Sequence, residues 1–179
     1  MQAFLKFSAS VDTMNRWFGY IASFCVLAAC AVSSGNAALR YLFSLGSNAW
    51  LELQWYLFAY LVMFGAAHVL KVNEHVRVDL IYGSLGVRGK IWVDLLGLLV
   101  FLMPATLYLL WLCIPPFIDA WHTGEISPNA GGLVRWPARL ALPIGFALVA
   151  LQGVSEIVKR IAMLSGHLTA EAHYERPLQ

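Results

Sequence analysis

The sequence predicts an all-α integral membrane protein with four transmembrane helices, short interfacial helices and both termini in the cytoplasm. Its apolar residues fall into four long blocks, at about residues 17–39, 53–70, 91–114 and 138–158. Since a helix rises about 1.5 Å per residue, about 20 residues cross a hydrocarbon core of roughly 30 Å. Each block has about that length and is apolar on all sides, whereas a helix of a soluble protein needs only one apolar face.

The composition agrees with this fold class. Hydrophobic residues make up 60% of the 179 residues, charged residues make up 12%, and the mean hydropathy is +0.67. We expect residues 1–165 to form one four-helix membrane domain and residues 166–179 to form a polar cytoplasmic tail. The net charge is +2 and the basic residues are dispersed, which argues against nucleic acid as a partner and leaves membrane lipids as the surroundings.

The distribution of basic residues predicts the orientation. If the chain crosses the membrane four times, nine of its 12 Lys and Arg residues lie on one side, and only Arg40, Arg135 and Arg139 lie on the other. By the positive-inside rule, the side with nine is cytoplasmic. The connections near residues 40–49 and 115–137 then face outward, and the connection 71–90 faces the cytoplasm.

The first block predicts a span that packs closely against another helix. It is rich in small residues, which let helix backbones approach each other in lipid. The residues before Trp17 are more polar and indicate a separate short interfacial helix. Residues 27–30 match the cleavage pattern of bacterial lipoproteins, in which Cys30 would be lipidated, but the apolar stretch continues to Leu39 and favours an intact span.

The turn before the second block contains Gly46-Ser47-Asn48, which is typical of a helix start before Trp50. Trp50 and Trp55 lie where a membrane protein carries its interfacial aromatic belt. We expect Glu52 in the first turn of this helix, where the positive end of the helix dipole favours an acid.

Prolines and glycines punctuate the second half of the chain. Pro104 falls in the middle of the third block and should kink it, and the pair Pro115 and Pro116 should end it. The following segment, 117–136, contains a glycine-rich turn and is expected to be an outward loop. In the fourth span, Glu156 and Arg160 have the spacing of an ion pair on one helix face.

The chain shows no pattern that indicates catalysis. It has no glycine-rich phosphate loop, no metal-spaced Cys and His cluster and no nucleophile triad. Ligation of haem by two histidines requires them on two helices, and only His68 lies inside a span, so we expect no cofactor. The acids Glu52, Asp94 and Glu156 lie near the ends of their blocks, and we expect no polar interior. These features indicate a non-catalytic membrane subunit that acts as a scaffold rather than a pore.

Four short motifs follow one another in the first half of the chain. They are Arg40-Tyr41, Trp50-Leu51-Glu52-Leu53-Gln54-Trp55, Gly65-Ala66-Ala67 and His75-Val76-Arg77-Val78-Asp79. In order and spacing these motifs resemble the small permease (DctQ-type) subunit of tripartite ATP-independent periplasmic (TRAP) transporters. The similarity covers about residues 40–79, and residues 125–127 and 135–137 resemble the outward loop of that family. One departure is that Leu51 stands where the family often has the first of two adjacent acids, so only Glu52 is carried over.

The resemblance implies a non-enzymatic role in sodium-driven import of an organic acid across a bacterial inner membrane. It implies two partners: a periplasmic substrate-binding protein, and a large permease subunit of about twelve spans of roughly 20 residues each. It also suggests Trp50, Glu52 and Trp55 as a subunit interface at the outward end.

A second motif lies on the cytoplasmic side. His75, Arg77 and Asp79 would order the cytoplasmic loop through an Arg–Asp pair or lipid headgroups. An ordinary solvated charged loop is the alternative interpretation of these three residues.

Two other functions remain open from the sequence. The chain is an alternative candidate for the membrane-anchor subunit of a respiratory oxidoreductase, which haem absorbance would reveal. A small multidrug exporter is less favoured, because such carriers usually need a membrane-embedded acid and the first span has none.

Overall fold

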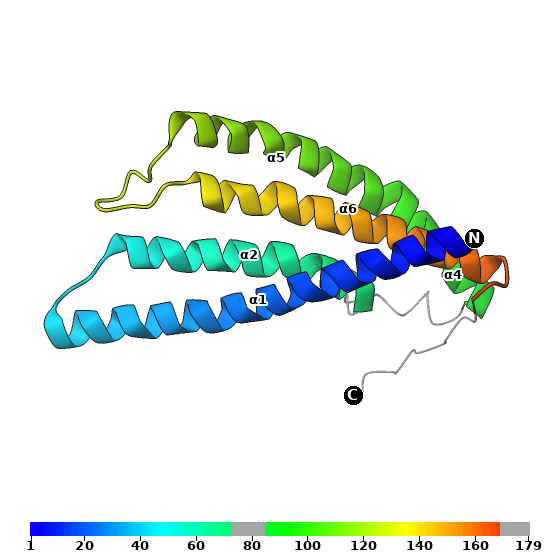
Figure 1. Ribbon diagram of the computed structural model, residues 1–179, viewed down its shortest axis with the longest axis horizontal. Helices are drawn as coiled ribbons and strands as arrows, with labels where there is room; N and C mark the ends of the chain where they lie inside the picture. Colours follow the sequence, from blue (N-terminus) through cyan, green and yellow to red (C-terminus); the bar gives the residue numbers. More distant parts are fainter. Residues whose placement is uncertain (73–84, 169–179) are drawn as a thin grey trace.

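The structure is a computed structural model that describes residues 1–72 and 85–168. These residues form long helices lying side by side in an elongated bundle (Figure 1). The elements between residues 87 and 123 follow one another without a break and form one continuous helical segment. Residues 1–72 and 85–168 thus contain four helical segments that are long and apolar enough to cross a membrane. The elements are α1 (Gln2–Phe43), α2 (Asn48–Val72), α4 (Val87–Leu96), the π-helix η1 (Gly97–Leu102), α5 (Met103–Thr123) and α6 (Trp136–Leu164).

This architecture confirms the expected all-α fold with four spans. The predicted motif residues His75, Arg77 and Asp79 lie outside the described residues. We call the end with the α1–α2 turn and the α5–α6 loop the outward end, after the side that the basic residues predict for it. The opposite end is the inner end.

Helix α6 is the central element of the bundle. Half of its most apolar stretch is buried, against 17% in α1 and 11% in α2. It packs against α1, α2, α4 and α5, while α5 packs mainly on α6 and exposes its other side. The large apolar side chains on the outside of α5, such as Leu107 and Trp111, are suited to face lipid.

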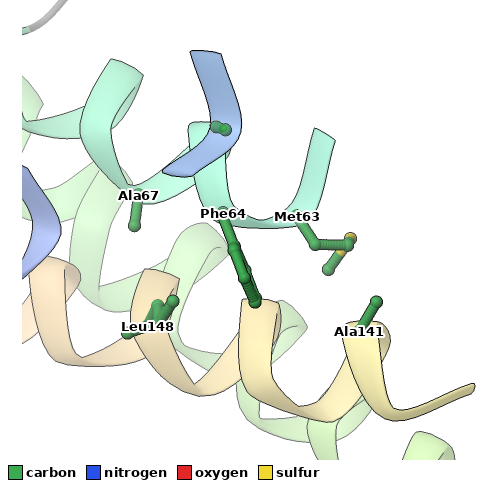
Figure 2. Packing of buried hydrophobic residues seen from close by; sticks show 6 residues of the cluster. Met63, Phe64, Ala67, Ala141 and Leu148 are labelled. Atoms are coloured by element: carbon green, nitrogen blue, oxygen red, sulfur yellow. The ribbon is translucent and has the colours of Figure 1, made fainter. Parts of the chain in front are cut away.

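A small apolar core joins α1, α2 and α6 in the middle of the bundle. Met63, Phe64 and Ala67 of α2 lie over α6 at Ala141 and Leu148 (Figure 2). Gly145 of α6 lies so close to α2 that a Cβ atom there would come within 3.0 Å of the Met63 Cα.

The small residues of α1 have the packing role that the sequence predicts. Gly19, Ala22, Cys25 and Ala29 are all buried along one stripe. A Cβ atom at Gly19 would lie 2.8 Å from the ring of His68 on α2, so the missing side chain permits this close approach.

The expected separate interfacial helix before Trp17 is wrong, because α1 runs unbroken from Gln2. Its polar beginning packs in the bundle: Ser8, Val11 and Asn15 are buried and continue the stripe at helical spacing. Ser8, Asp12 and Asn15 form hydrogen bonds with α6, so this segment does not have to lie on the membrane surface.

The expected helix end at Pro115 and Pro116 is also wrong, because α5 continues to Thr123. Packing on α6 outweighs the lost backbone hydrogen bonds: Ala120 is fully buried, and Arg139 donates to the Pro116 carbonyl at 3.0 Å. The loop is correspondingly shorter than expected and spans residues 124–135. At Pro104 the chain forms the π-helix η1 just before the proline, which relieves the clash of its ring with the preceding turn.

Candidate functional site: polar clusters at the two ends of the bundle

Glu52 is buried at the outward end, where its carboxylate fixes the α5–α6 loop. Oε1 accepts hydrogen bonds from the Ser127 hydroxyl and, at 2.8 Å, from the Asn129 amide. Oε2 accepts from the Leu133 backbone N–H at 2.7 Å. We call this arrangement the outward clamp. It ties the second span to a loop about 80 residues further along the chain.

The clamp differs from the expected stabilisation of Glu52 by the helix dipole. Helix α2 begins at Asn48 and its first turn holds no acid. Because Glu52 lies one turn deeper, it is stabilised by donors of the loop instead. Short contacts between Ile126 and Val134 and between Ser127 and Leu133 hold the loop in a narrow hairpin around the carboxylate.

A second acid, Glu125, fixes the base of the same loop. Arg135 donates to its carboxylate at 2.8 Å and Arg139 approaches it at 2.7 Å. The hydrogen bond to Glu125 raises the pKa of Arg135 above its ordinary value, so this guanidinium stays charged at any physiological pH. The rings of Trp121 and Trp136 meet edge to face at 4.6 Å and close the junction of α5 and α6.

The three residues predicted to form a subunit interface do not share one surface. Glu52 is 5% exposed and faces the loop of its own chain, whereas Trp50 is 44% and Trp55 is 69% exposed. With about 100° per residue, the two tryptophans point about 140° apart around α2. Glu52 therefore acts inside this chain, and only the tryptophans are presented outward.

The inner end contains a buried polar cluster that the sequence reasoning missed. It joins the beginning of α1 to the last three turns of α6. We call it the inner polar cluster; its members are Ser8, Asp12, Asn15, Gln152, Ser155, Glu156 and Lys159.

Gln152 lies at the centre of the inner polar cluster and is fully buried. Its Nε2 donates to Asp12 at 2.9 Å and to Glu156 at 3.0 Å, and its Oε1 accepts from Asn15 at 2.7 Å. Lys159 lies 2.9 Å from Asp12 and 2.5 Å from Glu156, so both carboxylates are paired.

Further contacts extend the inner polar cluster to the other helices. Lys71 of α2 donates to the Asp12 backbone carbonyl at 3.1 Å. Arg160 pairs with Asp94 of α4 at 3.2 Å and with Glu156 at 3.6 Å, which confirms the expected pair on α6. The cluster therefore fastens four elements of the bundle at its inner end.

The apolar core separates the outward clamp from the inner polar cluster. Within residues 1–72 and 85–168, no group of three or more His, Cys, Asp or Glu side chains is arranged to hold a metal ion. The carboxylates of both clusters are already bound by cations or hydrogen-bond donors. This geometry suits polar groups that fasten helices together, and it defines the class of the chain as a multi-pass membrane protein built as a braced helical bundle.

Comparison with known families identifies the chain more closely. The family "Tripartite ATP-independent periplasmic transporters, DctQ component" matches residues 29–163. The chain belongs to this family, which confirms the resemblance seen in the sequence. It is accordingly a small permease subunit of a TRAP transporter, not an enzyme, and membership implies association with a larger permease subunit and a substrate-binding protein. Neither a curated protein nor a solved structure matches the chain significantly.

The inner polar cluster was detectable in the sequence in principle. Ser8, Asp12 and Asn15 recur at intervals of four and three, and Ser155 and Glu156 follow Gln152 at distances of three and four residues. Each set lies on one helix face. What the sequence lacks is any sign that these two faces, 137 residues or more apart, meet each other.

Proposed function

We propose that this chain is the small permease subunit of a sodium-driven TRAP transporter that imports an organic acid across a bacterial inner membrane. In this proposal it forms part of the fixed frame against which a large permease subunit of about twelve spans of roughly 20 residues moves the substrate. A periplasmic binding protein delivers that substrate.

The observation that supports the scaffold role is that polar contacts hold the helices together at both ends of the bundle, with an apolar core between them. Secondary transporters move one helical bundle against another. A subunit whose ends are tied by the outward clamp and the inner polar cluster resists such internal movement. Buried polar groups of this kind favour one arrangement of helices over others.

We further propose that Trp50 and Trp55, on two different faces of α2, each contact the large subunit, while Glu52 holds the neighbouring loop of its own chain. Large exposed aromatic side chains are frequent anchors of protein interfaces. We keep an ordering role for His75, Arg77 and Asp79 in the cytoplasmic loop as a proposal based on the sequence alone.

Purification of the tagged chain, expressed with its neighbouring subunits, tests the assignment. We expect a larger hydrophobic subunit to remain bound in mild detergent. Liposomes that hold this complex should take up organic acids only with an inward sodium gradient and the binding protein present. Uptake by the small subunit alone would refute the scaffold role, and uptake without sodium would refute the coupling.

Replacing single tryptophans by alanine tests the proposed interface with the large subunit. Trp50→Ala and Trp55→Ala should lower the amount of large subunit recovered per tagged chain. Trp111→Ala is the matched control, because Trp111 is 65% exposed on the far side of α5. Equal recovery in all three variants would contradict the proposed interface and leave the family assignment untouched.

A further inference from the structure

A groove opens at the outward end between α2 and the beginning of α6. Its volume is about 340 Å³, at the lower end of the range of roughly 300–1,000 Å³ that small-molecule sites occupy. Residues 138, 139 and 142 line it from one face of α6, and residue 135 lines it from the N-cap just before this helix. The lining residues are Trp55, Tyr56, Arg135, Ala138, Arg139 and Leu142.

The outward end of the groove carries two arginines with unused hydrogen-bond donors. Arg135 uses Nη1 for Glu125, and Arg139 uses Nη1 for the Pro116 carbonyl and Nη2 for Glu125. The remaining guanidinium N–H groups have no hydrogen-bond acceptor in the described part of the chain. Glu125 pairs with both arginines, and the nearby Glu52 carboxylate also acts electrostatically on Arg135. The two carboxylates leave these arginine N–H groups unoccupied. Donors suited to a phosphate therefore remain free here.

The other end of the groove is apolar. Ala138 and Leu142 lie one and two turns further into α6, toward the middle of the membrane. Trp55 forms one wall, and its ring is largely exposed. Tryptophan at this level of a membrane protein typically lies among lipid headgroups, with its apolar ring toward the hydrocarbon.

We propose that this groove binds one glycerophospholipid of the outward leaflet. The phosphate lies against Arg135 and Arg139, and the upper part of an acyl chain follows Ala138 and Leu142. The argument is the direction of the groove: its charged end faces the outward water and its apolar end descends into the bilayer, as a lipid does. A soluble anion would use only the upper half of this surface.

Photolabelling in nanodiscs tests the proposal on the complex with the large subunit. The probe is phosphatidylethanolamine with a diazirine near the headgroup end of one acyl chain. We expect adducts in residues 135–142 in excess over residues 105–112 of α5. Ala138→Trp fills the groove and should lower labelling roughly fivefold, which corresponds to about 1 kcal/mol of binding free energy. Ala105→Trp on the exposed side of α5 is the control and should leave it unchanged.

Three outcomes would overturn the lipid site. They are equal labelling of the α5 and α6 segments, unchanged labelling in Ala138→Trp, and loss of labelling on addition of inorganic phosphate, which would indicate a site for soluble anions. Cross-links from residue 138 to the large subunit without lipid adducts would show that protein fills the groove. Thermal unfolding of each variant shows that the bundle is intact.

Discussion

Replacing Gln152 by leucine tests whether the inner polar cluster holds α1 against α6. Leucine has nearly the same size and a high helix propensity, so α6 itself should remain intact. The substitution removes three hydrogen bonds, those to Asp12, Asn15 and Glu156. Both Gln152 and Asn15 are fully buried, so water cannot replace the lost partners without opening the helix contact.

The expected loss of stability is about 3 kcal/mol. Interhelical hydrogen bonds in membrane proteins contribute on average about 0.6 kcal/mol each, which gives roughly 2 kcal/mol for three. The amide of Asn15 then has no partner at all, because its Oδ1 is already without one in the described part of the chain. A buried polar group without a partner costs about 1–3 kcal/mol, of which we count the lower part.

The assay is reversible unfolding in mixed micelles, followed by helix content and compared with the unsubstituted chain. Adding Asn15→Leu to Gln152→Leu should recover about 1 kcal/mol, because two apolar partners of similar size avoid the unpaired amide. Thr106→Val is the control: its buried hydroxyl bonds only to carbonyls of its own helical segment, and we expect less than about 0.5 kcal/mol. A loss below about 1 kcal/mol for Gln152→Leu, or strict additivity of the two leucines, would refute the reasoning.

Three further substitutions test other contacts. Gly145→Ala should lower the free energy of unfolding by about 1–2 kcal/mol, because the added methyl group overlaps Met63. Glu52→Gln should raise amide hydrogen exchange at Leu133 about tenfold or more, because the clamp carboxylate accepts that N–H. Lys159→Met should cost about 2–3 kcal/mol, somewhat less than a fully buried ion pair, because the lysine is 19% exposed.

Each of these changes has a matched control in the same chain. Gly35→Ala meets open space and should be neutral or slightly stabilising, so a loss equal to that of Gly145→Ala would contradict the packing argument. Asp119→Asn removes an exposed acid of α5 and should leave the exchange at Leu133 unchanged. Lys6→Met removes an exposed cation; if it destabilises as much as Lys159→Met, the inner polar cluster is not the cause.

The proline pair in α5 and the acid Glu52 show which structural features local sequence patterns can predict. The pair Pro115 and Pro116 signals a helix end, and in isolation two missing N–H groups justify that expectation. The structure overrides it because Ala120 packs on α6 and Arg139 binds the Pro116 carbonyl. The sequence singles out Glu52 as an interface residue, whereas its hydrogen-bond partners are loop residues of the same chain. These partners lie 75 to 81 positions away, beyond any local pattern.

The sequence by itself determined the fold class, the four spans and the membership in the transporter family. Those properties follow from the length and hydropathy of each segment and from local motifs. Each transmembrane helix must be long and apolar enough by itself to cross the bilayer, and it satisfies its backbone hydrogen bonds internally. The tertiary structure alone decided which polar residues meet, that the polar beginning of α1 stands against α6, and that α2 and α6 leave a groove between them. Such contacts depend on how helix faces are rotated toward one another, and the hydropathy of a single helix carries no information about the face its neighbour presents.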